Sequence, residues 1–258
     1  MTSSGLAIRV ISLRESAERR ALVQENLGDC PLPWAFLDAS EPDDPGGLET
    51  GATEQEARFG RTLTSGEVAC FQSHARALHA FDDDPDLRWL IVLEDDVWLD
   101  TKFPFGELTG WLDAKSIGFL RLYAREWRRA FARYRFGERQ VLYLASDPHG
   151  AQGYMISRDA AARLRLRLRL QRVARPFDDE LGRFWENGLD NHLLFPFPII
   201  ERHLTSTLIA DRETAGRAGR RLTPGRFWTR AKDFLRKRAY LAWRLSPLAP
   251  DRIRLRKR

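Results

Sequence analysis

The chain has 258 residues, of which 43% are hydrophobic and 11% aromatic, which suits one large folded domain and argues against a disordered chain. Two cysteines, Cys30 and Cys70, exclude a disulfide framework, and no CxxC spacing suggests zinc, so we expect two buried thiols in a reducing compartment. The net charge of +6 is unevenly spread: residues 221–258 hold 13 Lys and Arg against two acids, while the rest of the chain is slightly acidic.

The two ends of the chain predict where the protein works. The N-terminus has no basic stretch followed by a long apolar core, and no apolar run approaches the ~20 residues that span a bilayer. We therefore expect a cytoplasmic protein. The basic C-terminal segment predicts an anionic partner, either nucleic acid or a membrane.

The first part of the chain predicts strands and helices in alternation. β-branched and apolar runs predict strands over 6–13 and 34–40. Apolar residues at helical spacing predict a helix over 14–27, capped by Ser16. Pro, Gly and acidic residues cluster over 41–55, which predicts a loop.

The middle of the chain continues the alternation. A helix is predicted over 63–81 with Ser65 as its cap, followed by a continuous apolar strand over 89–93. Two further strands are predicted over 118–123 and 141–145.

The last part predicts a helix and a final strand. Residues 157–175 are expected to be helical, although the Leu/Arg alternation over 163–170 favours a strand by its period. Residues 192–200 predict a last strand interrupted by prolines. This pattern predicts an α/β fold with a mostly parallel central sheet, as a single domain over 1–215, followed by a basic helical tail over 216–258.

Three adjacent carboxylates end one of the predicted strands. The stretch LIVLEDDVWLD, residues 90–100, places Glu94, Asp95 and Asp96 directly after a buried strand. In open α/β folds the carboxyl ends of strands bind ligands, and hard oxygen ligands there suit Mg²⁺ or Mn²⁺ together with substrate phosphates. A solvated acidic turn is the alternative on this pattern alone.

Five segments in order resemble a known family. They are VISLRESAERR near the start, LTSGEVACFQSH, VLEDD, AQGYMISRDAAARL and PFDDEL. In this order they resemble glycosyltransferase family 25, which includes lipopolysaccharide and lipooligosaccharide sugar transferases of Gram-negative bacteria. The resemblance runs from Ile8 to Ile209 and implies a GT-A-like nucleotide-diphosphosugar transferase fold.

The resemblance also implies roles for acidic residues. Asp96 and then Asp95 correspond to the metal-binding acids of the family, with Mn²⁺ or Mg²⁺ as the cofactor, and His203 is a candidate late metal ligand. Asp178, in PFD, is the candidate catalytic base, with its neighbour Asp179 as the second choice. The alternative for both aspartates is a helix N-cap.

A further set of residues is expected to bind the donor. The arginines follow the first strand, and surface ion pairs are the alternative for them. A structural histidine is the alternative for His74. A turn with a core tyrosine is the alternative for Gly153 and Tyr154. The expected donor-binding residues are Arg14, Arg19, Glu67, Ser73, His74, Glu94, Gly153 and Tyr154.

The family resemblance implies an inverting, metal-dependent transferase that moves a sugar, most simply galactose from UDP-galactose, onto a cell-surface saccharide. The acceptor is expected to be lipid-linked at the inner face of the bacterial inner membrane. Aromatic and basic residues in the tail resemble an interfacial amphipathic helix that contacts anionic lipid. A nucleic-acid-binding protein and a metal-dependent hydrolase or nucleotidyltransferase are the competing hypotheses.

Overall fold

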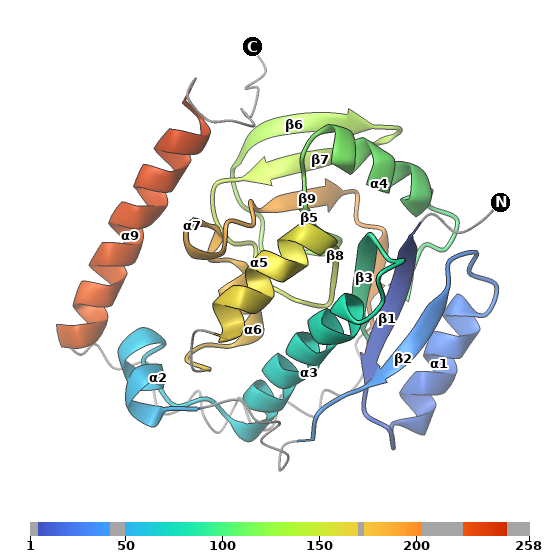
Figure 1. The fold of residues 1–258 in the computed structure, drawn as a ribbon, viewed down its shortest axis with the longest axis horizontal. Helices are drawn as coiled ribbons and strands as arrows, with labels where there is room; N and C mark the ends of the chain where they lie inside the picture. The colour runs from blue at the N-terminus through green and yellow to red at the C-terminus, as the bar shows by residue number, and fades with distance from the viewer. Residues whose placement is uncertain (1–4, 42–49, 170–172, 203–223, 247–258) are drawn as a thin grey trace.

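A computed structural model describes residues 5–41, 50–169, 173–202 and 224–246 (Figure 1). The strands are β1 (Leu6–Ser12), β2 (Trp34–Asp38), β3 (Trp89–Glu94), β4 (Val97–Leu99), β5 (Phe119–Arg121), β6 (Ala130–Phe136), β7 (Arg139–Leu144), β8 (Gly153–Ser157), β9 (His192–Phe195) and β10 (Ile199–Glu201). The helices are α1 (Ala17–Leu27), α2 (Ala52–Arg58), α3 (Ser65–Asp82), α4 (Phe105–Ala114), α5 (Arg158–Arg169), α6 (Phe177–Leu181), α7 (Phe184–Asn187) and α9 (Pro224–Arg244).

An eight-stranded sheet forms the centre of the molecule, in the order β2-β1-β3-β8-β5-β9-β7-β6. The pairs β1–β2, β1–β3 and β5–β9 are parallel, and the remaining neighbours are antiparallel. Only β7 and β8 run against the common direction, so six of the eight strands point the same way. The predicted α/β fold with a mostly parallel sheet is confirmed in this sense of strand direction. It is consistent with the GT-A-like fold expected from the sequence.

Helices cover both faces of the sheet, and the residues of β3 alternate between the two cores. Leu90 and Val92 pack into the core that α3, α5 and α6 complete. Trp89, Ile91 and Leu93 pack into the opposite core, which α1 and α4 complete. Burial on both faces explains why this strand reads as a continuous apolar run.

The cap of α3 differs from the prediction by one residue. Thr64 is the N-cap: its side chain accepts a hydrogen bond from the backbone N–H of Glu67, whose carboxylate accepts one from the Thr64 N–H. This reciprocal pair is a capping box, and it corrects the assignment of Ser65. Ser16 does occupy the N-cap position of α1, but its side chain makes no capping hydrogen bond.

Several elements were not predicted. Helix α2 begins inside the segment expected to be a loop, where Gln55 donates to the Val173 carbonyl and accepts from the Leu63 backbone, at 3.0 and 2.9 Å. The contact with Val173 joins parts of the chain that are far apart in sequence, which local composition cannot indicate. Strands β4, β6 and β8 and helix α4 were also missed, and the predicted last strand is divided into β9 and β10 around the cis Phe195–Pro196 bond.

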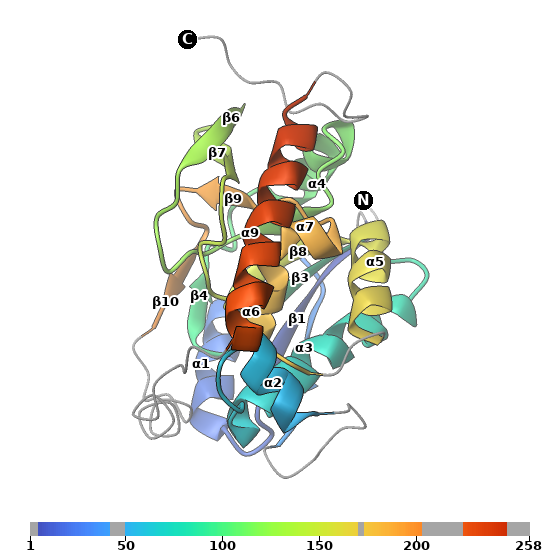
Figure 2. The ribbon, with the colours of Figure 1, turned by 90° about the vertical axis from the view of Figure 1, so that its left-hand side faces the viewer.

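The C-terminal helix α9 is confirmed over 224–244, within the predicted basic tail. Figure 2 shows it lying across the side of the molecule that carries α2, α6 and α7. Asp190, just after α7, accepts hydrogen bonds from the Tyr240 hydroxyl at 3.1 Å and from Arg244 Nε at 2.9 Å. Among the described helices, none is long and apolar enough to cross a membrane.

Candidate active site

A small pocket of about 60 Å³ lies where the carboxyl end of β3 meets the start of α3 and the start of α6. This is the sheet edge at which open α/β folds bind ligands. The pocket brings together predicted site residues from three separate segments of the chain. Its lining residues are Glu67, Cys70, Glu94, Asp96, Arg125, Gly150, Ala151, Gln152, Pro176, Phe177 and Asp178.

Asp95, the middle acid of the three, is paired with side chains of the protein itself. The Ser12 hydroxyl donates to its Oδ2 atom and Arg19 Nη1 donates to its Oδ1 atom, each at 2.7 Å. Its side chain is 9% exposed. Both carboxylate oxygens are therefore held, by the end of β1 and the start of α1, and Asp95 and Arg19 form a partly buried ion pair.

Asp96 meets a different environment. Its Oδ1 atom is buried with no hydrogen-bond partner among the described residues. Burial, followed by the charges of Glu94, Asp95 and Glu201, raises the pKa of Asp96 to about 7. A carboxylate with an unpartnered oxygen beside other acids fits a hard divalent cation, so Asp96, with Glu94 beside it, is the natural oxygen donor set for Mn²⁺ or Mg²⁺.

Strand β10 supplies an acid that the sequence did not single out. It pairs with β4, and the Arg202 backbone N–H donates to the Asp96 carbonyl at 2.7 Å. Glu201 accepts hydrogen bonds from the Tyr123 hydroxyl at 2.6 Å and from Arg125 at 3.1 Å. The only signal in the sequence was its place just before His203, a predicted metal ligand that lies outside the described residues.

The two candidate bases differ in what they face. Asp178 lines the pocket with Asp96, and its Oδ1 atom accepts the backbone N–H of Asp179 at 2.9 Å. Asp179 lies 3.4 Å from Arg175 Nε, and burial raises its pKa to about 6. Neither caps α6, because Pro176 is the N-cap and no side chain makes a capping bond there. Asp178 is thus the aspartate whose position suits proton transfer in the pocket.

Glu67 and His74 are brought to the same region by α3, but both are engaged. Glu67 belongs to the capping box and makes two hydrogen bonds with Arg61, at 2.8 and 2.7 Å. His74 is buried, its ring stacks on Phe177 with centroids 4.3 Å apart, and its Nδ1 atom lies 3.2 Å from the Tyr154 hydroxyl. Its Nε2 atom lies 3.6 Å from Glu94 Oε1.

The remaining predicted donor-binding residues do not line the pocket. Tyr154 is fully buried in the core, and a Cβ on Gly153 would lie 2.5 Å from Ile199 Cδ1. Close packing therefore explains this glycine and tyrosine, and their contact with the donor stays a prediction. Ser73 bonds the backbone of Ser40 and Ala69. Arg14 is exposed and pairs with Asp38 at 2.7 Å.

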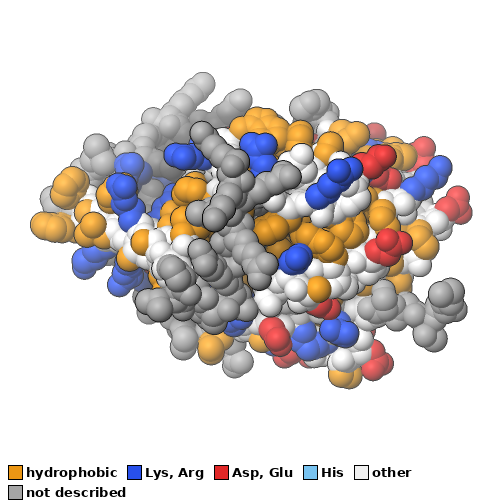
Figure 3. Space-filling model, turned by 90° about the horizontal axis from the view of Figure 1, so that it is seen from above, with side chains coloured by type: hydrophobic (Ala, Val, Ile, Leu, Met, Phe, Trp, Pro, Cys, Tyr) orange, Lys and Arg blue, Asp and Glu red, His pale blue; other side chains and the backbone are white. Residues whose placement is uncertain are grey.

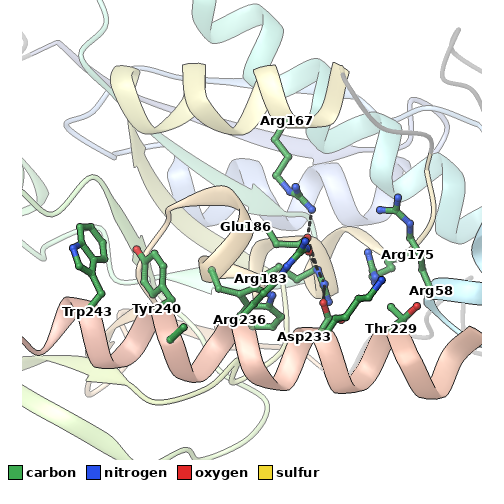
Figure 4. Close-up of a pocket in the computed structure, with 13 residues that line it drawn as sticks. Arg58, Arg167, Arg175, Arg183, Glu186, Thr229, Asp233, Arg236, Tyr240 and Trp243 are labelled. Carbon is green, nitrogen blue, oxygen red and sulfur yellow. Dashed lines mark hydrogen bonds and ion pairs between the residues drawn. The ribbon is translucent and has the colours of Figure 1, made fainter.

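A second pocket, of about 850 Å³, lies between α9 and the rest of the domain (Figure 4). Arginines from α5 and the segments around α6 and α7 point into it and meet carboxylates there. Arg183 donates to Glu186 at 2.9 Å and to Asp233 of α9 at 2.6 Å, and Arg167 donates to the same glutamate. Because the charges meet each other, this network fastens α9 to the domain.

Comparison with known proteins identifies relatives of this chain. The chain is 34% identical over 170 residues to the lacto-N-neotetraose biosynthesis glycosyltransferase LgtE of Neisseria gonorrhoeae, covering 58% of this chain and 56% of that protein. It is 30% identical over 168 residues to the lipooligosaccharide biosynthesis protein lic2B of Haemophilus influenzae, covering 60% of each. The chain thus spans a little over half the length of these relatives.

Two solved structures are more distant. A glycosyltransferase involved in the glycosylation of the major capsid of PBCV-1 matches with a TM-score of 0.40 and 15% identity, covering 70% of this chain and 74% of that one. The A197 protein from STIV matches with a TM-score of 0.45 and 12% identity, over 78% and 86% of the two chains.

The family model described as glycosyltransferase family 25 (LPS biosynthesis protein) matches residues 6–179, which is well over half of the chain. The matched residues include the three adjacent acids, the α3 segment and both candidate bases. The chain therefore belongs to glycosyltransferase family 25.

Proposed function

We propose that the protein is a metal-dependent, inverting glycosyltransferase that moves galactose from UDP-galactose onto a lipopolysaccharide or lipooligosaccharide acceptor. The observation that carries the proposal is that Asp96 and Asp178 both line one pocket. Asp96 has a buried oxygen without a partner among the described residues, and Asp178 stands free of a helix-capping role. The relatives LgtE and lic2B, named for lacto-N-neotetraose and lipooligosaccharide biosynthesis, support the substrate class.

The pocket chemistry fits this reaction. The acids Glu67, Glu94, Asp96 and Asp178 line the pocket, and Arg125 is the basic residue in its lining. Such a pocket repels a nucleotide diphosphate unless a cation is present, and Asp96 with Glu94 would hold that cation. When bound, it would supply positive charge that stabilises the departing diphosphate.

Asp178 has the role of base in this proposal. Its carboxylate would accept the proton of the acceptor hydroxyl as that oxygen attacks the sugar carbon. Its Oδ1 atom is oriented by the Asp179 N–H, which leaves Oδ2 for the acceptor. Attack on the face opposite the leaving diphosphate inverts the configuration at that carbon.

The direct test is the stereochemistry of the product. Purified protein is incubated with UDP-galactose, Mn²⁺ and a lactose- or glucose-terminated acceptor, and the linkage is read from the anomeric coupling constant in the proton NMR spectrum. We expect a β-linked product from the α-linked donor, and none after EDTA treatment. An α-linked product, or transfer that survives metal removal, would contradict the proposed mechanism.

We also place the acceptor at a membrane. The face of α9 turned away from the domain exposes large apolar residues among basic ones, and Figure 3 shows orange and blue side chains together at the end of the molecule where α9 lies. Such a face suits the surface of an anionic bilayer, where each basic residue adds about 1 kcal/mol. The exposed apolar residues on this face are Phe227, Trp228, Phe234 and Leu235, whereas Trp243 lines the pocket between α9 and the domain. We accordingly propose that the protein works at the cytoplasmic face of the inner membrane.

Vesicle flotation tests this placement. The full chain should float with vesicles that contain phosphatidylglycerol, and Trp228→Ser combined with Leu235→Ser should abolish flotation. The matched control is Trp127→Ser, which removes an equally exposed tryptophan, 63% exposed against 64% for Trp228, from outside α9. Equal flotation of all three proteins would overturn the membrane proposal and leave the catalytic one untouched.

A further inference from the structure

A cluster of three side chains that could bind a metal lies at the small pocket of about 60 Å³. Sγ of Cys70, a ring nitrogen of His74 and a carboxylate oxygen of Glu94 all lie within 4.8 Å of one another. Cys70 and His74 are four residues apart and so share one face of α3, while Glu94 ends β3 opposite them. The acidic motif of the family does not account for a thiol and an imidazole in this position.

The spacing of the cluster is close to that of tetrahedral coordination. Zinc bonds of about 2.0–2.3 Å to nitrogen, oxygen and sulfur place neighbouring ligand atoms roughly 3.3–3.7 Å apart. The His74 Nε2 atom already lies 3.6 Å from Glu94 Oε1. Cys70 Sγ lies within 4.8 Å of the other two ligand atoms, so a side-chain shift of about 1 Å brings it to tetrahedral spacing. Because Cys70 and Glu94 also line the pocket, the fourth position faces it.

The histidine is held in a geometry suited to a metal ligand. Its side chain is 1% exposed, and Nε2 has no hydrogen-bond partner within the described ranges. Stacking on Phe177, at an interplanar angle of 3°, fixes the ring plane. The Tyr154 hydroxyl lies 3.2 Å from Nδ1 and can accept its proton, which leaves the Nε2 lone pair directed at the cluster. An outer partner of this kind is typical of metal-bound histidines.

We propose that Cys70, His74 and Glu94 form a binding site for a thiophilic divalent cation, with Zn²⁺ as the best match. A thiolate is a soft ligand that favours Zn²⁺ over Mg²⁺ or Mn²⁺, so this site differs in chemistry from the oxygen donors around Asp96. Glu94 belongs to both donor sets, so a cation bound at Cys70, His74 and Glu94 leaves Asp96 to hold Mn²⁺ or Mg²⁺ without it. Binding to the metal-free protein is measured directly, so the test does not depend on the proposed transfer reaction.

Cobalt titration reads out the thiolate. Co²⁺ bound by a cysteine gives a near-ultraviolet sulfur-to-metal charge-transfer band, and the chain has two cysteines, both half-buried rather than buried as expected from the sequence. The band should appear in the wild type and in Cys30→Ser, be lost in Cys70→Ser, and be displaced by Zn²⁺. A band that persists in Cys70→Ser, or that requires Cys30, would overturn the proposal.

Two further measurements cover the case in which a variant folds poorly. In the wild-type protein, Zn²⁺ should slow alkylation of Cys70 by iodoacetamide at least tenfold and leave the Cys30 rate unchanged, as read by mass spectrometry. Tyr154→Phe removes only the outer partner and should weaken Zn²⁺ binding about 10- to 100-fold. Equal protection of both thiols, or none, would contradict the site.

Discussion

At the scale of single residues, neighbouring carboxylates differ in role because they meet different partners. Asp95 is held by Ser12 and Arg19, whereas the Oδ1 atom of Asp96 meets no donor among the described residues. The position of these acids directly after a predicted strand identified the acidic motif. The family resemblance favoured Asp96 over Asp95 as the metal ligand. The sequence could not show that Arg19, proposed as a donor contact, lies 2.7 Å from Asp95.

Asp96→Asn should make the metal-free protein more stable above neutral pH. The folded-state pKa of Asp96 is about 7, against 3.8 for an exposed carboxyl, so the unfolded chain ionises first and wild-type stability falls as pH rises from about 4 to about 7. Asn cannot ionise, so the Asp96→Asn variant does not lose this stability as the pH rises. Thermal unfolding at pH 5 and pH 8 should show a gain in Tm that is larger at pH 8.

Asp95→Asn is the matched control for that experiment. It weakens the ion pair with Arg19 and should lower Tm at both pH values. The account of Asp96 would be contradicted if Asp96→Asn changed Tm equally at pH 5 and pH 8, because the effect would then not come from ionisation.

Asp178→Asn should reduce kcat far more than Asp179→Asn. A positioned base contributes about 10²- to 10⁴-fold, and the asparagine keeps the shape while removing the basic oxygen. Asp179 pairs with Arg175 instead of lining the pocket, so its change should leave kcat within about tenfold. Steady-state kinetics with saturating donor measures both, and equal losses in the two variants would remove Asp178 from the role of base.

At the scale of elements, α3 carries much of the site and depends on its capping box. Thr64→Ala should lower the free energy of unfolding by about 1 kcal/mol, because it removes the acceptor for the Glu67 N–H. Ser65→Ala, at the first helical residue, should cost clearly less. Urea unfolding of the two variants compares them, and a larger loss for Ser65→Ala would contradict the observed cap.

Elements that rely on local pattern were predictable, and those that rely on distant partners were not. The apolar run of β3 and the helical spacing of α3 located the core of the site from sequence. Strand β10 brings Glu201 to Asp96 across more than a hundred residues, through pairing with the three-residue β4. Strands this short have almost no periodicity to read.

At the scale of the whole molecule, α9 is part of the folded body and also presents an apolar, basic outer face. Its inner face is fastened by Asp190, whose side chain is 10% exposed and receives Tyr240 and Arg244. The sequence predicted the helix and its positive charge, but no local signal indicated that Asp190 would bind Tyr240 and Arg244. Because α9 is packed against the domain, a membrane that contacted its outer face would also set the orientation of the domain.

Asp190→Ala should release this helix. Removing one partner of a buried ion pair costs about 3–5 kcal/mol, since the other charge is left uncompensated. Hydrogen exchange of peptides within 224–244 should speed up while peptides of β1 and β3 keep their protection. Lys232→Ala, an exposed change on the same helix, should leave exchange unaltered. Unchanged protection in Asp190→Ala would contradict the docking described here.

The central claim is that Asp96 holds a cation that in turn admits a nucleotide diphosphate to an acidic pocket. Its most direct test is thermal unfolding of the purified chain with UDP, with and without Mn²⁺, in wild type and Asp96→Asn. UDP at about 100 times its Kd should add about 2.7 kcal/mol, a readable rise in Tm. We predict a rise that requires Mn²⁺ and is lost in Asp96→Asn. A rise that occurs without metal, or that survives in the variant, would contradict the claim.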